Sequence, residues 1–209
     1  MKAFIFDLDG VIVSTDKLHY LAWKEMADKE GIYFDEKIND RLRGVSRMAS
    51  LEIILERATR SYTEQEKIAL AEFKNDLYKQ SLVLLTSEDR LEGVTETLSA
   101  LREKGYLLAI GSSSRNAKPI LKQIGYENYF DAVSDGTNIS KSKPDPEVFV
   151  KAAEMLGLTP QDCYVVEDAE AGIVAGADGG FKTFGLGEAS LCERTTYPLK
   201  AFKQILEHV

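Results

Sequence analysis

The chain has 209 residues, of which 44% are hydrophobic and 29% are charged, and its formal net charge is −8. This composition predicts a globular protein with a sizeable core and excludes a disordered or collagen-like chain. The negative charge argues against nucleic acid or an anionic membrane surface as a partner, so an anionic ligand would need a local cationic pocket.

The first element is the apolar run "AFIF" at 3–6, which stops at Asp7 and predicts a buried strand. From about residue 15 to 88 the chain shows helical periodicity and no convincing strand. In "KLHYLAWKEMADKEG" at 17–31, apolar residues recur at helical spacing and predict one buried face, made of Leu18, Leu21, Ala22 and Met26.

Two further helices are predicted in the same region. The stretch "SRMASLEIILERA" at 46–58 repeats the helical pattern, and "TEQE" at 63–66 matches a capping box with Thr63 as N-cap and Glu66 three residues on. In the first of these helices the predicted apolar face is Met48, Leu51, Ile54, Leu55 and Ala58. Residues 15–88 are therefore expected to form an all-helical insert.

After residue 91, helical stretches alternate with short apolar runs. "GVTETLSALREKG" at 93–105 predicts a helix that stops at Gly105, and the runs "LLAIG" at 107–111 and "YVV" at 164–166 predict strands. "TFGLG" at 183–187 is a weaker candidate. The alternation predicts an α/β fold, a Rossmann-like doubly wound parallel sheet, with a core of 1–14 and 89–209 interrupted by the helical insert.

Polar residues follow each predicted core strand. They are Asp7 and Asp9, "SSSRN" at 112–116, the loop "SKSKPDP" at 140–146, and Glu167–Asp168. In doubly wound sheets ligands bind outside the carboxyl ends of the strands, so we expect these side chains to share one crevice. Carboxylates, serine hydroxyls and a lysine gathered in this way favour a hard cation and a phosphate.

The charges favour phosphoryl transfer. Asp7, Glu167 and Asp168 would repel a phosphate monoester, whereas Mg²⁺ together with Lys143 would offset much of that repulsion. Ser112 and backbone N–H groups suit the remaining phosphate oxygens. Asp7 would be the nucleophile, and Asp9 would handle the proton of the leaving or attacking oxygen.

Each signal alone has an ordinary structural explanation. Asp9-Gly10 is a common turn, Glu167–Asp168 suits a helix N-terminus, "SSSRN" suits a loop, and Lys143 suits a solvated lysine. His19 alone suits a histidine without a ligand, and Trp23 suits packing between insert and core. The functional interpretation rests on all the polar sets falling at strand ends that are expected to meet.

The motifs "FDLDGVI", "SSS", "KP" and "VVEDAEAGI", in this order and spacing, resemble the four motifs of the haloacid dehalogenase superfamily of phosphotransferases. The resemblance covers nearly the whole chain. It implies that the helical insert is similar to that superfamily's small α-helical cap, which closes over the site and selects the substrate.

Within the superfamily the chain resembles the β-phosphoglucomutases. Thr15 and His19, followed by Trp23, match their pattern at the entrance to the cap; "GVSR" at 44–47 with Ser50, and Lys74–Asn75, match their cap motifs. One departure is that "SSSRN" replaces the expected Ser-Ala-Ser-Lys-Asn. Arg115 keeps the charge of the lysine but not its geometry.

This resemblance implies an isomerase that interconverts β-D-glucose 1-phosphate and β-D-glucose 6-phosphate through an aspartyl-phosphate enzyme and β-glucose 1,6-bisphosphate. The implied catalytic residues are Asp7, Asp9, Thr15, His19, Ser112 and Lys143. Those implied for substrate binding are Trp23, Gly44, Val45, Ser46, Arg47, Ser50, Lys74, Asn75, Ser113, Ser114, Arg115 and Asn116. Mg²⁺ would be bound by Asp7, the backbone carbonyl of Asp9, Glu167 and Asp168.

Two alternatives remain open. The same site with water as acceptor would make a sugar-phosphate phosphatase, and a protein that only binds sugar phosphates is disfavoured by the intact aspartates and acidic pair.

The longest apolar runs, such as "LVLL" at 82–85, are far shorter than the ~20 residues of a membrane span. Asp7 and Asp9 interrupt any signal-peptide pattern, and Cys163 and Cys192 form no CxxC motif. We expect a cytoplasmic monomer with two reduced thiols.

Overall fold

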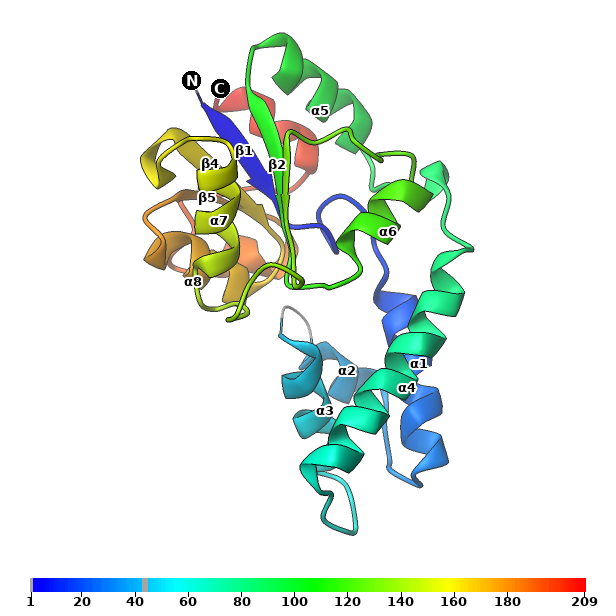
Figure 1. The fold of residues 1–209 in the computed structure, drawn as a ribbon. Coiled ribbons are helices and arrows are strands. Elements are labelled where there is room, and N and C mark those ends of the chain that lie inside the picture. Colours follow the sequence, from blue (N-terminus) through cyan, green and yellow to red (C-terminus); the bar gives the residue numbers. More distant parts are fainter. Residues whose placement is uncertain (1, 43–44) are drawn as a thin grey trace.

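A six-stranded parallel sheet forms the centre of the α/β part of the molecule, which is the upper part of Figure 1. The computed structural model describes residues 2–42 and 45–209. The strand order is β3-β2-β1-β4-β5-β6, and every neighbouring pair is parallel. The strands are β1 (Ala3–Phe6), β2 (Leu107–Gly111), β3 (Ala132–Ser134), β4 (Cys163–Glu167), β5 (Lys182–Gly185) and β6 (Tyr197–Pro198).

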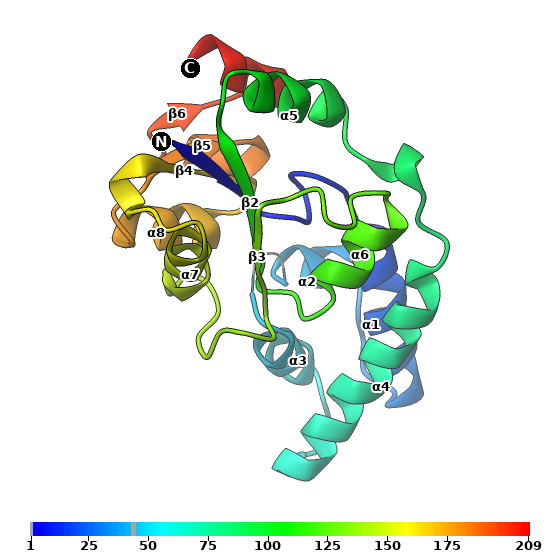
Figure 2. The same ribbon diagram turned by 45° about the horizontal axis from the view of Figure 1, so that its top comes forward.

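Alternate residues of β1 point into two different hydrophobic clusters because successive side chains of a strand face opposite ways. Phe4 and Phe6 pack with α5 (Val94–Glu103), α6 (Ala117–Gln123) and the 3₁₀ helix η4 (Phe202–Glu207). Ala3 and Ile5 pack with α7 (Glu147–Met155) and α8 (Glu170–Asp178). Figure 2 shows α7 and α8 on one side of the sheet and α5 on the other. The short 3₁₀ helices η2 (Pro160–Asp162) and η3 (Gly187–Leu191) lie in the connections.

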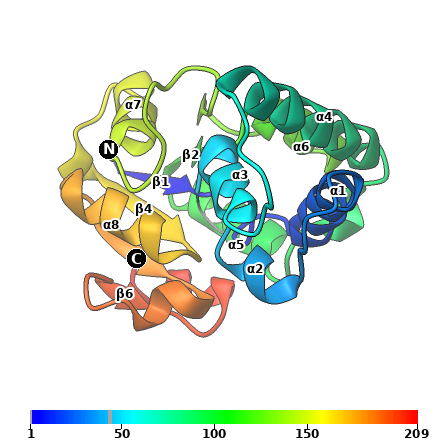
Figure 3. The ribbon, with the colours of Figure 1, turned by 90° about the horizontal axis from the view of Figure 1, so that it is seen from below.

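Four helices inserted between β1 and α5 form the cap. They are α1 (Asp16–Lys29), α2 (Glu36–Asp40), α3 (Arg47–Leu55) and α4 (Glu64–Leu82), followed by the 3₁₀ helix η1 (Ser87–Asp89). They enclose their own hydrophobic cluster, which includes Trp23, Met26, Phe34, Leu51 and Ile54. Seen from below, these helices lie in front of the sheet (Figure 3).

The chain leaves the core and returns to it at one place. Val13 forms an antiparallel bridge with Arg90, and the Leu91 N–H donates to the Ile12 carbonyl at 3.0 Å. Two passages of chain therefore connect cap and core side by side (Figure 1). The expected cap boundaries, 15 and 88, fall just inside this bridge and stay a prediction.

The predicted strands at 3–6, 107–111 and 164–166 are confirmed, and the weaker candidate at 183–187 ends earlier, at Gly185. The Thr63–Glu66 capping box is present. The prediction that Leu21 faces the core of the cap is wrong, because its side chain is 51% exposed. The buried stripe of α1 runs through Ala22, Trp23 and Met26, which places Leu21 beyond its edge. Within the described residues, no helix has the length and apolarity that a membrane crossing requires.

Candidate active site

Three acidic side chains meet at the carboxyl ends of the neighbouring strands β1 and β4. Asp7 directly follows β1, Glu167 ends β4, and Asp168 comes next. Because the two strands are parallel and paired, their ends lie side by side. One carboxylate oxygen from each residue lies within 4.8 Å of the others, and Asp7 and Glu167 are buried. The fold therefore concentrates negative charge at one point at the edge of the sheet.

Lys143 supplies a buried positive charge to this acidic cluster. Its Nζ lies 2.5 Å from Asp7 Oδ1 and 2.6 Å from Glu167 Oε1. Burial acts to lower the pKa of Lys143, but the charges of Asp7 and Glu167 outweigh it, so the pKa stands above its usual value. Lys143 therefore remains an ammonium ion at neutral pH.

One ammonium ion does not balance three carboxylates. Burial, followed by the charges of Glu167, Asp7 and Asp9, raises the pKa of Asp168 to about 8. Burial likewise raises the pKa of Glu167. Carboxylate oxygens are the ligands that Mg²⁺ prefers, so the donor set fits that ion and a bound cation would relieve the repulsion.

Gly10 makes room for this cluster. Its φ is +85°, and a Cβ placed on it would lie 2.0 Å from Asp168 Oδ2. A side chain at position 10 would therefore displace the Asp168 carboxylate as well as strain the backbone. The Asp-Gly pair thus does more than make a turn, because the glycine admits a carboxylate of the expected metal site.

Both carboxylate oxygens of Asp9 accept hydrogen bonds from Thr15, the residue that precedes α1. The Thr15 N–H donates to Oδ1 at 2.6 Å, and Thr15 Oγ1 donates to Oδ2 at 2.5 Å. Burial raises the pKa of Asp9 to about 7, although the two Thr15 hydrogen bonds act in the opposite direction. A carboxyl group that titrates near neutrality suits general acid/base work.

The serine loop after β2 winds back onto itself at the start of α6. Ser112 Oγ accepts from the Ser114 N–H at 3.2 Å, and Ser114 Oγ accepts from the Asn116 N–H at 3.1 Å. Ser113 Oγ accepts from the Lys143 N–H at 3.4 Å, which joins this loop to the one after β3. The predicted convergence of the two loops is thus found in the structure.

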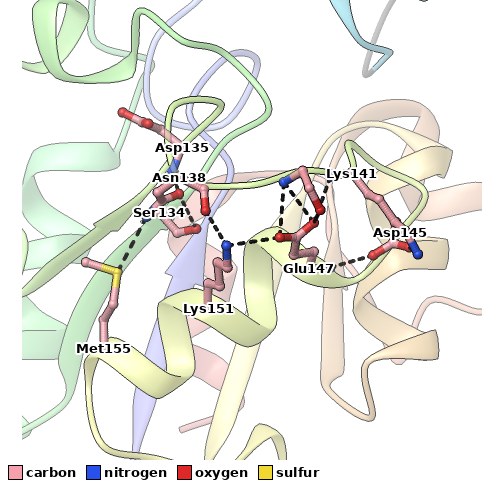
Figure 4. A network of polar contacts seen from close by, with 9 residues as sticks. Ser134, Asp135, Asn138, Lys141, Asp145, Glu147, Lys151 and Met155 are labelled. Atoms are coloured by element: carbon pink, nitrogen blue, oxygen red, sulfur yellow. Dashed lines mark hydrogen bonds and ion pairs between the residues drawn. The ribbon is translucent and has the colours of Figure 1, made fainter.

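The loop after β3, which carries Lys143, is fastened to α7 by Glu147 (Figure 4). The Glu147 carboxylate accepts from the Ser140 N–H at 3.0 Å, from Ser140 Oγ at 2.8 Å and from the Lys141 N–H at 2.7 Å. Lys151 lies 3.0 Å from the same carboxylate and also donates to the Asn138 carbonyl. These contacts, Lys151 first among them, lower the pKa of Glu147 to about 2.

On the cap side, His19, Trp23 and Lys74 form a packed group. Lys74 Nζ lies 2.7 Å from His19 Nδ1 and 4.7 Å from the ring centre of Trp23. Burial, with a smaller effect of the Arg47 charge, lowers the pKa of Lys74 to about 7. Burial and the Lys74 charge also lower the pKa of His19, so the imidazole is neutral at neutral pH.

Two arginines line the space between cap and core, Arg47 from the cap and Arg115 from the loop after β2. Arg47 begins α3, and its pKa is lowered by burial and by the charge of Arg115. Arg115 Nε donates to the Gly136 carbonyl at 3.1 Å, which leaves its two terminal nitrogens uncommitted to that bond. An arginine can make this contact and still present a planar pair of N–H groups to an anion. The lysine expected at position 115 has a single ammonium group and cannot do both in this way.

A cavity of about 580 Å³ lies between cap and core, and most of the predicted site residues line it. Thr15 does not, because it is fully buried behind Asp9, and Gly44 lies outside the described residues. The predicted residues that line the cavity are Asp7, Asp9, His19, Trp23, Val45, Ser46, Arg47, Ser50, Lys74, Asn75, Ser112, Ser113, Ser114, Arg115, Asn116, Lys143, Glu167 and Asp168.

Some details differ from the expected roles. The Ser46 hydroxyl accepts from the Ala49 N–H at 3.3 Å and so caps α3. Asn75 and Asn116, both expected to bind substrate, are hydrogen-bonded to each other. Met48, expected on the buried face of its helix, is 37% exposed and lines the cavity instead. Glu72 also lines the cavity, and no motif drew attention to it.

Comparisons with known proteins agree with the geometry. A β-phosphoglucomutase from Bacillus subtilis is 45% identical over 190 residues, which are 90% of this chain and 84% of that protein. The fructose-1-phosphate phosphatase YqaB from Escherichia coli is 31% identical over 176 residues, 84% of this chain and 91% of that one. The crystal structure of a β-phosphoglucomutase from Clostridium difficile is 37% identical, with a TM-score of 0.91 over 98% of this chain and 93% of that chain.

The family model of haloacid dehalogenase-like hydrolases matches residues 1–180, which contain all four strand-end motifs of the cavity. Sequence, sheet order and inserted helices thus agree, and the chain belongs to the haloacid dehalogenase-like hydrolase family.

Proposed function

We propose that this protein is a β-phosphoglucomutase, which interconverts β-D-glucose 1-phosphate and β-D-glucose 6-phosphate through β-glucose 1,6-bisphosphate. One observation carries the proposal: a single cavity is lined by two sets of cationic side chains, Lys143 beside Asp7, and Arg47 with Arg115, whose charges act on each other. A mutase needs two phosphate sites because its intermediate carries two phosphates. The similarity to the Bacillus subtilis β-phosphoglucomutase supports the same function.

In the first step, an Asp7 carboxylate oxygen attacks the phosphorus of the 1-phosphate of β-glucose 1,6-bisphosphate, the bond from that phosphorus to the sugar oxygen breaks, and glucose 6-phosphate is released. Asp9, in its protonated form, gives its proton to that departing oxygen. A pKa of about 7 lets Asp9 hold the proton before the step and release it during the step. Lys143 and Ser112 hold the oxygens of the transferring group, where their donors offset the charge.

Asp7, Glu167, Asp168 and the Asp9 carbonyl would hold Mg²⁺. When bound, this ion supplies positive charge that lets a phosphate anion approach the acidic cluster. Lys143 alone offers one positive charge to three carboxyl groups, and the raised pKa values of Glu167 and Asp168 indicate that the cluster favours a further cation.

In the second step, the 6-hydroxyl of an incoming β-glucose 1-phosphate attacks the aspartyl phosphate, Asp9 takes the hydroxyl proton, and Asp7 is freed as β-glucose 1,6-bisphosphate forms. The bisphosphate then turns around, so that its 1-phosphate faces Asp7 for the next first step. Arg47 and Arg115 hold the phosphate that is not reacting, which suits their planar, bidentate donors. Closure of the cap keeps water from competing with the sugar hydroxyl.

A sugar-phosphate phosphatase is the second candidate, and the 31% identity to YqaB favours keeping it. It would use the same Asp7 and Asp9 chemistry with water as the acceptor. The two functions therefore differ only in what reaches the phosphorylated Asp7.

One assay separates them. The protein is incubated with β-glucose 1-phosphate, Mg²⁺ and a trace of glucose 1,6-bisphosphate, while glucose 6-phosphate and free phosphate are both followed. The mutase produces glucose 6-phosphate with little free phosphate. Release of stoichiometric phosphate without glucose 6-phosphate would favour the phosphatase over the mutase. If neither glucose 6-phosphate nor free phosphate forms, both proposed functions are rejected.

A further inference from the structure

Tyr78, a residue of cap helix α4, is connected to Asp9 through Thr15. Its side chain is fully buried, and Tyr78 Oη donates to Thr15 Oγ1 at 2.9 Å. Thr15 Oγ1 in turn donates to Asp9 Oδ2 at 2.5 Å. Tyr78 does not line the cavity, so within the described residues its link to the site runs behind the cavity wall.

The direction of this hydrogen-bond chain is fixed by counting protons. An ionised Asp9 carboxylate can only accept, so Thr15 must donate to it. A threonine hydroxyl has one proton, and once that proton points at Asp9 the oxygen can only accept from Tyr78. While Asp9 is ionised, Tyr78 therefore helps to hold the Thr15 hydroxyl in the orientation that donates to Asp9, and without the tyrosine hydroxyl Thr15 Oγ1 loses one of the two partners that fix it.

The tyrosine ring is itself held tightly. It stacks on His19 with ring centres 4.0 Å apart and planes 29° apart, and Lys74 Nζ lies 4.7 Å above its centre. Burial, followed by the charge of Asp9, raises the pKa of Tyr78, so the hydroxyl keeps its proton throughout the neutral range. The position of α4 in the cap is thereby transmitted to a carboxyl group in the core.

We propose that Tyr78 is a positioning residue that orients the Asp9 carboxyl for proton transfer by holding the Thr15 hydroxyl. The proposal rests on the proposed roles of Asp7 and Asp9 in phosphoryl transfer, and not on which sugar is the substrate. The proton itself moves between Asp9 and the departing or attacking oxygen, and Tyr78 neither gains nor loses one.

The test compares two aryl phosphates that differ in how much acid help their leaving groups need. Nitrophenolate leaves readily without a proton, whereas phenolate is more basic and depends more on an acid. The rate of aryl alcohol release in the first turnover, with saturating Mg²⁺, is measured for 4-nitrophenyl phosphate and for phenyl phosphate. Neither substrate carries a sugar, so the result does not depend on the glucose specificity.

The decisive variant is Tyr78→Phe, which removes one hydroxyl and keeps the ring stacked on His19 and next to Lys74. We expect phenyl phosphate to react about tenfold more slowly, which is the size of effect that one lost hydrogen bond gives. The rate with 4-nitrophenyl phosphate should change by less than about twofold. Equal losses on the two substrates would mean a structural role only and would overturn the proposal.

Tyr62→Phe is the matched control. Tyr62 is also a cap tyrosine, its Oη donates to Glu30 Oε2 at 3.0 Å, and Arg60 lies 3.7 Å above its ring centre. It does not line the cavity. We expect both aryl phosphates to react with this variant at the wild-type rate, and a selective loss here would overturn the proposal.

Thr15→Val breaks the same chain from the other side and guards against a Tyr78 variant that fails to fold. It should show the same selective loss on phenyl phosphate. In the double variant the Tyr78→Phe change should add nothing further, because the hydroxyl that it acts through is gone. Additive losses would overturn the proposal. A wild-type protein that hydrolyses aryl phosphates but never yields glucose 6-phosphate would overturn only the proposed function.

Discussion

The side-chain amide of Asn116 donates a hydrogen bond to Asn75 Oδ1 at 3.0 Å, and both side chains are buried. Asn116 precedes core helix α6, and Asn75 lies in cap helix α4. This bond therefore ties cap to core directly across the cavity wall.

Asn75→Ala should loosen the cap. Losing one buried hydrogen bond shifts the balance between closed and open cap by about two- to tenfold, so KM for glucose phosphates should rise by a similar factor. Hydrogen exchange of the free protein should increase at the start of α6 and in α4. If Asn75 only contacts substrate, KM rises but exchange in the free protein stays the same.

Asp7→Asn should abolish turnover without unfolding the protein. An amide is not a nucleophile of this kind, while Lys143 keeps Glu167 as its partner at 2.6 Å. The melting temperature should stay within a few degrees of wild type, and activity at saturating Mg²⁺ should be undetectable. Asp178→Asn is the control, because it makes the same change in a surface pair with Arg194 and should leave activity intact. Near-normal activity of Asp7→Asn would remove Asp7 from its role.

Arg47→Ala should separate glucose phosphates, whose reaction places a second, non-reacting phosphate in the site, from small phosphate esters, which place none there. Its planar fork suits the phosphate that is not reacting, and loss of such charged hydrogen bonds should lower kcat/KM for glucose phosphates about 10²-fold. Slow hydrolysis of 4-nitrophenyl phosphate should survive, since it needs only the Asp7 end. Arg57→Ala, an exposed arginine just beyond α3, should affect neither substrate. Equal losses on both would count against a phosphate site in the cap.

Glu147→Ala should lower kcat by releasing the loop that carries Lys143. The carboxylate holds Ser140 and Lys141, only a few residues before the lysine that contacts Asp7. Glu147→Gln keeps one acceptor oxygen and should be intermediate. Steady-state kinetics of both variants, beside melting curves, test this, and unchanged kcat with a lower melting temperature would limit Glu147 to stability.

Lys74 should make the stability of the protein depend on pH. Its pKa is about 7 in the folded protein and 10.5 as the ordinary value. Between these values the unfolded chain holds a proton that the folded protein lacks, so the free energy of unfolding rises with pH, by at most about 1.4 kcal/mol per unit. Urea unfolding from pH 7 to 10 should show that the free energy of unfolding of the wild type increases relative to that of Lys74→Met. Parallel curves for the two proteins would contradict the buried, readily deprotonated lysine.

The sequence could reveal the main strands and the acidic cluster because long apolar runs and their polar ends are local signals. Strand β3 escaped detection because its three residues, Ala132–Ser134, are too few to show a pattern, and β6 is a two-residue edge strand. Helical spacing predicts a buried stripe on α1 but not where the stripe ends, which is why Leu21 is exposed although the spacing places it on the buried face.

Contacts between distant segments were harder to predict. Lys143 lies 136 residues from Asp7 in the chain, and only the sheet order brings them together. Tyr78 resembled an ordinary core residue, although it lies four residues after Lys74 on the same helix and so faces the same way. That spacing was the one available signal for its place behind Asp9.

The bridge between Val13 and Arg90 has a consequence for how proteins of this kind diversify. Because the segment between them begins and ends at one point, exchanging it for another of different length costs the core little loop-closure entropy. Asp7, Lys143 and Glu167 all lie outside that segment, whereas Arg47 and Lys74 lie inside it. With the roles proposed above, the residues of the chemistry and the cap's share of the substrate contacts are encoded on separable pieces of one gene, and a graft between relatives would change the second while keeping the first.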